Sequence, residues 1–187
     1  MMIRLSSKIQ TDSIVDGEGI RTVIWTQGCP HNCAGCHNKE THSFDGGILV
    51  DIDDIKKQID NLQDQDGITL SGGDPLSQID ACLEIAKYVK SKKLNIWCYT
   101  GYTYEQIIKM GNINKKYLEF LLYIDVLVDG KFELDKKSLN LKFKGSSNQR
   151  IIDVNKTLLE HKICLVRKYS AIKKCKPLYK QPAHIFT

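Results

Sequence analysis

Four short apolar runs, each followed by a loop that contains glycine, limit most strongly how this chain of 187 residues can fold. They are residues 20–26, 67–70, 94–99 and 124–128. Runs of this length that are rich in β-branched and aromatic side chains are typical of buried strands. Residues 52–63 and 77–91, which lie between these runs, carry apolar residues at helical spacing. This alternation predicts an α/β fold with a mostly parallel, curved sheet and outer helices.

Less regular segments complete the expected fold. We expect a first strand within residues 2–9, two helices at 104–110 and 114–123 with a break at Gly111-Asn112, and a strand at 141–144. These units are too few for a closed barrel of eight strands, so a partial (βα) barrel is expected. Parallel strands joined by right-handed crossovers have their carboxyl ends on one side. The glycine-containing loops should therefore gather at one rim of the sheet.

Three cysteines lie in the loop after the first run, in GCPHNCAGCHN at residues 28–38. The spacing Cys29-x3-Cys33-x2-Cys36 favours a shared metal centre, because a short loop can direct several thiolates to one point. A closed site needs four ligands, whereas a 4Fe–4S cluster on three cysteines keeps one iron open. We favour the cluster. A structural zinc site and three thiols without metal remain open as alternatives. The histidines that would complete a zinc site are His31, His37 and His42.

Glycine-containing sequences also follow the other strands. The second run leads into Ser71-Gly72-Gly73-Asp74-Pro75, where two glycines allow the backbone to approach a ligand such as an amino acid. A plain tight turn is the alternative. Tyr99-Thr100-Gly101-Tyr102 and Asp129-Gly130-Lys131-Phe132 end the next two runs, at the same expected rim. Arg21 begins the first run, and we expect it to be exposed or paired with a carboxylate near the site.

The composition is that of an ordinary globular protein, with 42% hydrophobic and 26% charged residues. There is no apolar run of about 18 residues, so no membrane span is expected. The N-terminal residues lack a signal-peptide pattern, and seven cysteines, three of them clustered, suit a reducing compartment. These features predict a cytoplasmic protein. Cys82 and Cys98 fall on apolar patterns and are expected in the core, whereas Cys164 and Cys175 show no metal-ligand spacing.

The charge is uneven along the chain. The net charge is +5, and residues 161–187 hold seven basic residues and no acidic one. We expect one domain over residues 1–160 and a basic C-terminal extension that is not an independent domain. The simplest interpretation of the extension is a solvated end, and the alternative is that it binds nucleic acid, a membrane surface or an acidic partner. No direct contact with nucleic acid or membrane is expected.

Together these stretches resemble the radical S-adenosylmethionine (SAM) superfamily, and within it the activating enzymes of anaerobic, class III ribonucleotide reductases. The similarity runs from about Ile14 to Arg150. In the order of that family it comprises VDGEGIRTV, GCPHNCAGCHN, LSGGDPL, YTGY, LVDGKF and GSSNQR. The three cysteines are common to the superfamily, whereas the combination with YTGY, VDGKF and GSSNQR is specific to these small enzymes. Gly35 before the third cysteine also follows their pattern.

The resemblance implies the cofactors and the residues that bind them. Cys29, Cys33 and Cys36 would hold a 4Fe–4S cluster, whose fourth iron would bind the amino and carboxylate groups of SAM. The SAM contacts would be Gly35, Cys36, His37, Gly72, Gly73, Asp74, Thr100 and Gly101. No catalytic side chain beyond the cluster and SAM is implied, because the cofactor performs the difficult chemistry.

The resemblance also implies the reaction and its partners. An electron from a donor such as flavodoxin or ferredoxin would cleave SAM to a 5′-deoxyadenosyl radical, which would form the glycyl radical on anaerobic ribonucleoside-triphosphate reductase. Our own hypothesis is that the reductase docks near GSSNQR and the basic extension. Three alternatives are another radical SAM enzyme, which activates a different glycyl-radical enzyme or modifies a small molecule, a non-catalytic zinc module, and an electron-transfer ferredoxin. The absence of a nearby fourth cysteine weakens the ferredoxin hypothesis.

Overall fold

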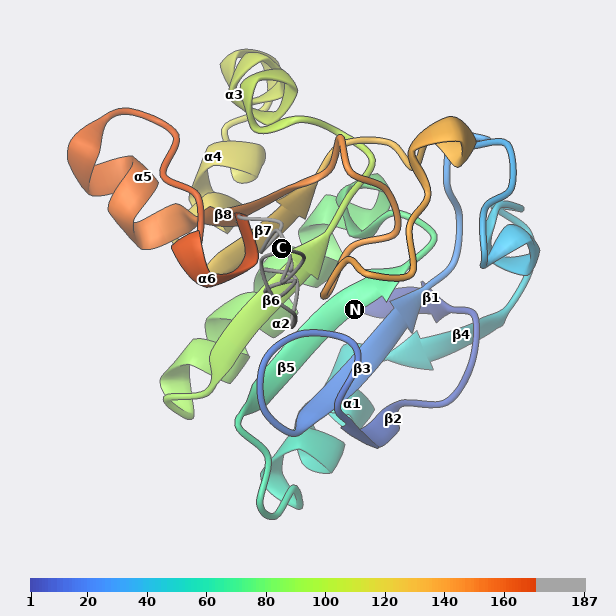
Figure 1. Ribbon diagram of the computed structural model, residues 1–187. Helices are drawn as coiled ribbons and strands as arrows, with labels where there is room; N and C mark the ends of the chain where they lie inside the picture. Colours follow the sequence, from blue (N-terminus) through green and yellow to red (C-terminus); the bar gives the residue numbers. More distant parts are fainter. Residues whose placement is uncertain (171–187) are drawn as a thin grey trace, which may run out of the picture.

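The computed structural model describes residues 1–170, which fold as an α/β structure around one open, mixed sheet (Figure 1). The strand order is β4-β1-β3-β5-β6-β7-β8, and β2 pairs with β3. The central strands are parallel: β3 (Arg21–Thr26), β5 (Gly67–Gly72), β6 (Asn95–Tyr99) and β7 (Val126–Asp129). Antiparallel strands flank them: β1 (Met2–Leu5), β2 (Gln10–Ser13), β4 (Ile48–Asp51) and β8 (Arg150–Asp153). The expected α/β class and parallel centre are confirmed, and the sheet is not closed.

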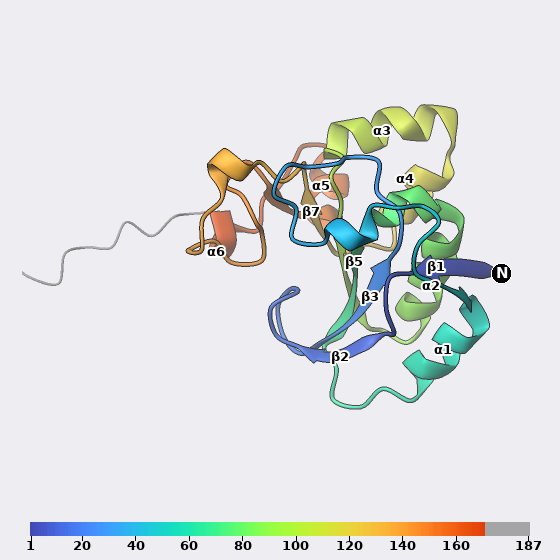
Figure 2. The same cartoon turned by 90° about the vertical axis from the view of Figure 1, so that its right-hand side faces the viewer.

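Helices pack mainly on one face of this sheet, as Figure 2 shows for α1, α2 and α4. The helices are α1 (Ile52–Asp60), α2 (Ile79–Ser91), α3 (Tyr104–Ile113), α4 (Lys116–Leu121), α5 (Val154–Glu160) and α6 (Arg167–Ser170). Short 3-10 turns are η1 (Lys39–Thr41), η2 (Pro75–Gln78) and η3 (Leu134–Lys136). The Asp51 carboxylate accepts the Asp53 amide and so begins α1 where the sequence predicts a cap. Among residues 1–170 no helix is long and apolar enough to cross a membrane.

The two faces of the sheet differ in chemistry. The helix-covered face carries a row of paired core residues: Ile24, Leu70, Cys98, Leu127 and Ile152. Cys82 and Cys98 are fully buried there, as the sequence predicts. Because side chains alternate along a strand, Trp97 and Tyr99 belong to the opposite face. There Trp97 meets Phe143 and Tyr169 edge-on, at ring centroid distances of 5.4 and 6.2 Å.

Two segments behave differently from the sequence prediction. Residues 141–144 form no strand, because Phe143 has a φ of 55° and turns its ring toward Trp97. The helix break falls at Asn114-Lys115 and not at Gly111-Asn112. Gly111 lies inside α3, where a Cβ would lie 2.3 Å from Leu118 of α4. This glycine therefore permits close helix packing and does not end the helix.

Arg21 is neither exposed nor paired with a carboxylate, which corrects the sequence expectation. Its side chain is 1% exposed at the start of β3, the end of the strand away from the cysteine loop. Nε donates to Thr69 Oγ1 at 2.7 Å and Nη2 donates to the carbonyl of Ile68 at 2.6 Å. The guanidinium also lies 5.6 Å from the Trp97 ring centroid. Arg21 thus ties β3 to β5 and β6 at the end of the sheet away from the rim.

Candidate functional site

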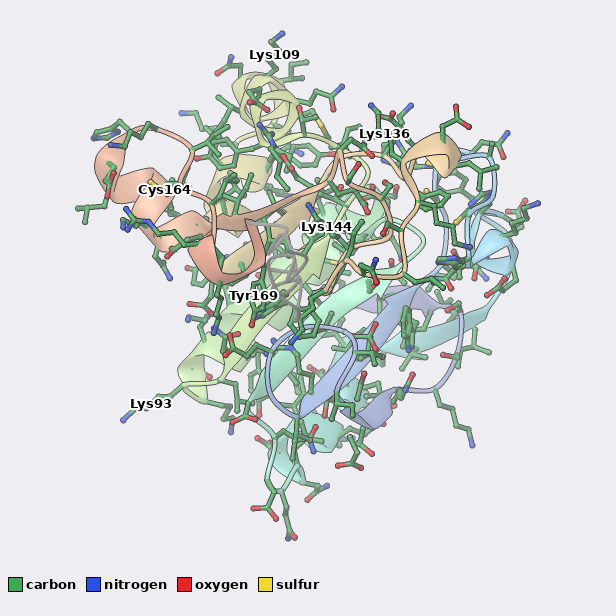
Figure 3. The ribbon with its side chains drawn as sticks, in the orientation of Figure 1. Lys93, Lys109, Lys136, Lys144, Cys164 and Tyr169 are labelled. Carbon is green, nitrogen blue, oxygen red and sulfur yellow. The ribbon has the colours of Figure 1, made fainter. Side chains whose placement is uncertain are left out.

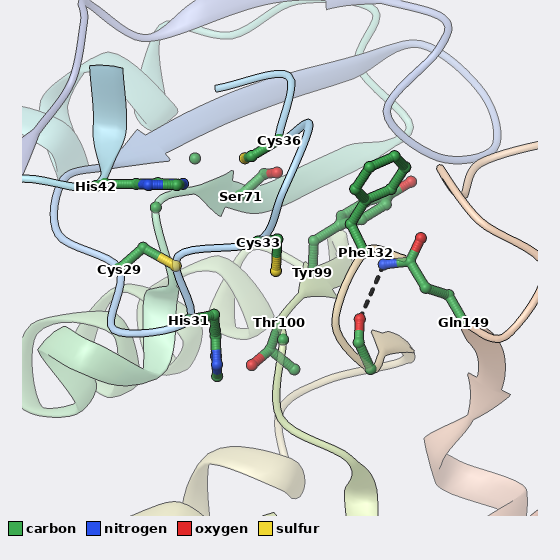
Figure 4. Close-up of a pocket in the computed structure, with 14 residues that line it drawn as sticks. Cys29, His31, Cys33, Cys36, His42, Ser71, Tyr99, Thr100, Phe132 and Gln149 are labelled. Carbon is green, nitrogen blue, oxygen red and sulfur yellow. Dashed lines mark hydrogen bonds between the residues drawn. The ribbon is translucent and has the colours of Figure 1, made fainter. Parts of the chain in front are cut away.

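One pocket lies where β3, β5 and β6 end, and the three cysteines share it with two glycine-containing loops (Figure 4). The loop after β3 supplies Cys29, Cys33 and Cys36. The turn after β5 supplies Gly72 and Gly73, and the loop after β6 supplies Thr100 and Gly101. The parallel centre of the sheet therefore brings these loops to one rim, as the sequence predicts.

Asp74 connects the three loops from beneath the pocket. It is fully buried, and its carboxylate accepts the Leu76 amide at 3.0 Å, which begins η2. It also accepts the Thr100 hydroxyl at 2.9 Å and the Gly101 amide at 3.0 Å. Nε2 of His31, from the cysteine loop, lies 2.7 Å from Asp74 Oδ2. One buried carboxylate thus fixes the relative positions of all three loops.

The glycine turn after β5 packs closely against the cysteine loop. Gly72 has a φ of 104°, a region that favours glycine, and a Cβ on Gly73 would lie 2.4 Å from the Gly28 carbonyl oxygen. The Asp74 amide donates to that same carbonyl at 2.9 Å, and the Gly73 amide donates to Thr26 at 2.8 Å. The Gly73 amide is therefore occupied, and an ammonium group, which only donates hydrogen bonds, would meet this turn through carbonyl oxygens.

The three thiols lie together in the pocket, and burial acts on one of them. Cys29, Cys33 and Cys36 are each partly buried in the shared pocket. Burial raises the pKa of the Cys29 thiol to about 11, so its thiolate needs a positive partner. Within residues 1–170, no three Cys, His, Asp or Glu side chains are placed to hold one metal ion.

The far wall of the pocket comes from the segments after β7 and before β8. Gly130, Phe132 and Gln149 line it. The Gln149 side chain donates to the Gly130 carbonyl at 2.9 Å, the bond drawn in Figure 4, and accepts the Gly145 amide at 2.8 Å. The polar GSSNQR sequence is therefore a folded loop that Gln149 holds against β7.

Asp129 has a structural role beside this wall. Its carboxylate is 1% exposed, accepts the Tyr104 amide at 2.7 Å and pairs with the Arg150 guanidinium. Arg150 also binds Glu105, with Nη1 to Oε1 at 2.9 Å. These contacts join α3, β7 and β8, so Asp129 is not free for a ligand.

Comparison with known proteins assigns the family. Residues 15–152 match the family of 4Fe-4S single cluster domains. The anaerobic ribonucleoside-triphosphate reductase-activating protein of Haemophilus influenzae is 38% identical over 148 residues, which cover 74% of this chain and 90% of that protein. The chain belongs to this family of activating proteins. Its members in Enterobacteria phage T4 and Escherichia coli K12 are 35% and 36% identical, over 77% and 73% of this chain and 90% of each relative.

Seven residues that the sequence predicts for the site of this activating-protein family line the pocket. They are Cys29, Cys33, Cys36, Gly72, Gly73, Thr100 and Gly101. The other three, Gly35, His37 and Asp74, are not among the residues that line it. Asp74 is buried under the loops, Gly35 packs on Leu134, and the His37 ring centroid lies 5.6 Å from that of Phe132. The ligand contacts assigned to all ten remain predictions.

Several residues that shape this site are not singled out by the sequence analysis. Phe132 and Gln149 line the far wall, and Tyr99 lines the pocket from β6. The one sequence feature that could have indicated them is that they belong to the YTGY, DGKF and GSSNQR motifs. Cys164, labelled in Figure 3, lies outside the pocket, with Sγ 3.5 Å from Oε2 of Glu160. Cys175 lies outside the described residues.

Proposed function

We propose that the protein is a radical SAM enzyme, an oxidoreductase that activates anaerobic ribonucleoside-triphosphate reductase with a 4Fe–4S cluster and SAM. The pocket shared by the three cysteines and the Gly72-Gly73 turn carries this proposal. The reduced cluster, when bound, supplies the electron that cleaves SAM to methionine and a 5′-deoxyadenosyl radical, which takes hydrogen from a glycine of the reductase. The open sheet would then be the partial (βα) barrel of the superfamily.

The chain's own residues would bind and orient the cofactors. Cys29, Cys33 and Cys36 would ligate three irons. The carbonyl oxygens of the Gly72-Gly73 turn would accept hydrogen bonds from the amino group of SAM. Asp74 would act as a positioning residue, since it contacts all three loops and does not itself line the pocket.

The protein substrate would approach the same rim, because the hydrogen to be removed must reach the pocket. We expect the reductase to contact the loop of residues 145–150, which borders the pocket through Gln149. Ser147 is exposed at this loop, whereas the Gln149 side chain is used to hold it. Most of the basic extension, the second expected docking segment, lies outside the described residues. A donor such as flavodoxin or ferredoxin would supply the electron.

The test is anaerobic reconstitution with iron and sulfide, followed by EPR of the reduced protein with and without SAM. The proposal expects a cluster signal that shifts when SAM is added, formation of 5′-deoxyadenosine, and a glycyl-radical signal when the reductase is present. Cys36→Ser should abolish the cluster, whereas Cys164→Ser, a thiol outside the pocket, should keep it. A cluster that does not respond to SAM would contradict the proposal, and a colourless protein that binds one zinc ion would support the zinc module.

A further inference from the structure

A long loop, residues 130–149, joins β7 to β8. Its regular elements are the turn η3 and an isolated bridge between Lys137 and Ser146. Connections of this length in a compact domain are usually either functional or disordered. Backbone bonds hold this one in place, since the Ser147 amide donates to the Lys136 carbonyl at 2.9 Å. An ordered loop of this length is therefore expected to have a function.

The first part of this loop packs on the cysteine loop. The His37 and Phe132 ring centroids lie 5.6 Å apart, and a Cβ on Gly35 would lie 2.8 Å from Cδ1 of Leu134. In Figure 1 η3, drawn in orange, accordingly lies beside the blue cysteine loop. Gly130 and Phe132 also line the pocket. A protein that docks on this loop would therefore come close to the three cysteines.

The loop carries positive charge that is not paired. Residues 131–144 contain five lysines and two acidic residues. Lys131, Lys137 and Lys142 are exposed and form no ion pair within the part of the chain that the structure describes, whereas Lys136 pairs with Glu133 at 2.6 Å. Every lysine in α1, α2 and α4, by contrast, pairs with a carboxylate: Lys56, Lys57, Lys87, Lys90 and Lys116. The three unpaired ammonium groups are therefore available to a partner.

Two exposed leucines lie among these lysines. Leu134 is 51% exposed and Leu139 is 94% exposed. Residues 1–160 as a whole hold slightly more acidic than basic residues, so they lack the broad positive face that nucleic acids and membranes require. A few apolar contacts with charged residues around them are typical of a small, transient protein interface. The expected partner is therefore a protein with negative surface charge.

The proposed reaction needs a partner that delivers an electron. Among residues 1–170 the other cysteines are Cys82 and Cys98 in the core and Cys164 outside the pocket, so this part of the chain offers no second cluster site to relay an electron. Electron transfer between proteins slows steeply with distance, so the donor must dock near the pocket. Electron-transfer encounters are typically weak, with small interfaces, and charge steers them.

We propose that the exposed lysines of residues 131–144 form the docking surface for an acidic one-electron carrier protein. This inference rests on the proposed function, since the docked carrier would reduce the cluster. In that step the carrier loses one electron, the cluster gains it, and no bond forms or breaks. Opposite charges bring the carrier to the loop, and the contact between this loop and the cysteine loop keeps the transfer distance short.

The first test measures how tightly oxidised flavodoxin, an acidic carrier, binds the reconstituted protein, by calorimetry without oxygen. The variant combines Lys131→Gln, Lys137→Gln and Lys142→Gln. We expect about tenfold weaker binding at about 0.01 M ionic strength, because each exposed charge pair contributes roughly twofold. The difference from wild type should disappear at about 1 M, where the Debye length is only about 3 Å.

The control combines Lys8→Gln, Lys93→Gln and Lys109→Gln. These lysines are also exposed and without ion pairs among residues 1–170, so the change in net charge is the same. Figure 3 shows Lys93 and Lys109 far from Lys136. The control should bind flavodoxin like the wild type. Both triple variants should keep the urea midpoint of the wild type, because exposed side chains contribute little to stability.

A second test compares two reductants. Photoreduced 5-deazariboflavin is a small molecule that needs no docking surface, so with it both triple variants should cleave SAM and form the glycyl radical at wild-type rates. With reduced flavodoxin the loop variant should cleave SAM about tenfold more slowly at low ionic strength, and the control should not.

The outcomes separate the docking inference from the proposed function. Equal flavodoxin binding by the loop variant and the control would overturn the inference and leave the proposed function in place. Normal reduction by flavodoxin with weak glycyl-radical formation in the loop variant would also overturn it, because the lysines would then bind the reductase. A wild-type protein that cleaves no SAM with 5-deazariboflavin would instead reject the proposed function.

Discussion

Nε2 of His31 lies 2.7 Å from Oδ2 of Asp74, and this contact joins the cysteine loop to the two loops that Asp74 already holds. Asp74→Ala should therefore destabilise the protein strongly. The change leaves the buried Thr100 hydroxyl and the Leu76 amide without their acceptor, and a hydrogen bond to a charged group contributes about 1.5–3 kcal/mol. We expect a loss of about 3–5 kcal/mol in the free energy of unfolding, measured with urea.

Asp80→Ala is the matched control for this experiment. Asp80 is 58% exposed and, among residues 1–170, forms an ion pair only with Lys116 on the surface, so its removal should cost under about 1 kcal/mol. Asp74→Asn should fall between the two alanine variants, because an amide keeps one acceptor oxygen and loses the charge. Equal stability of Asp74→Ala and Asp80→Ala would show that Asp74 does not hold the loops.

Gly101→Ala tests the His31 contact from the opposite side. A Cβ at residue 101 would lie 2.3 Å from Cδ2 of His31, so the imidazole must rotate away from Asp74. We expect lower iron content after reconstitution, because the cysteine loop loses the contact between His31 and Asp74 that holds it in place. The free energy of unfolding should fall by only about 1 kcal/mol. In a His31→Ala background, Gly101→Ala should have no further effect on iron content or stability. An additive loss in the double variant would place the effect of Gly101→Ala elsewhere.

The parallel centre of the sheet was predictable because its strands are continuous apolar runs. The same signal is missing from β2, whose residues Gln10–Ser13 are mostly exposed, and from the short edge strand β4. Residues 141–144 look like a strand, but the positive φ of Phe143 and its contact with Trp97 decide otherwise. The strands β2 and β4 thus lack the apolar pattern that predicts a strand, and at residues 141–144 a tertiary ring contact overrides the local strand propensity.

The sequence predicted most residues that line the site, but not the hydrogen bonds that connect its loops. Because parallel strands end at one rim, the loops with the cysteines, Gly72 and Gly101 had to meet. The contact between His31 and Asp74 joins residues 43 positions apart and depends on how two loops fold. The contacts of Gln149 also depend on how the loops fold, since its side chain bonds to the Gly145 amide and to the Gly130 carbonyl. Periodicity and spacing carry no signal for such bonds.

Arg21→Lys should destabilise the protein without affecting the pocket. Arg21 donates to Thr69, Ile68 and further acceptors at Asn95 and Glu18, and a lysine has fewer donors and no fork. We expect a loss of about 2–4 kcal/mol in the free energy of unfolding.

The cluster and its response to SAM should not change in this variant. The arginine lies at the opposite end of β3 from the cysteine loop, about 17 Å away by strand length. The exposed Arg167→Lys is the control and should leave both stability and EPR unchanged. A changed cluster signal in Arg21→Lys would show that the two ends of the strand are coupled.

The pair formed by Glu105 and Arg150 should make stability depend on acid pH. Hydrogen bonds from Arg150 lower the pKa of the Glu105 carboxyl from 4.5 to about 2, although burial opposes them. The folded-state pKa is depressed, so the stabilisation is fully present above pH 4.5 and is lost as the pH falls through about 2. Because Glu105 is 53% exposed, solvent screening limits the effect to about 1 kcal/mol.

Glu105→Gln should therefore unfold at a lower urea concentration than wild type at pH 6, and the two urea midpoints should approach each other between pH 4.5 and 2. Glu84→Gln, which removes a surface pair with Lys87, should stay close to wild type throughout, and a constant gap for Glu105→Gln across this range would contradict the assignment.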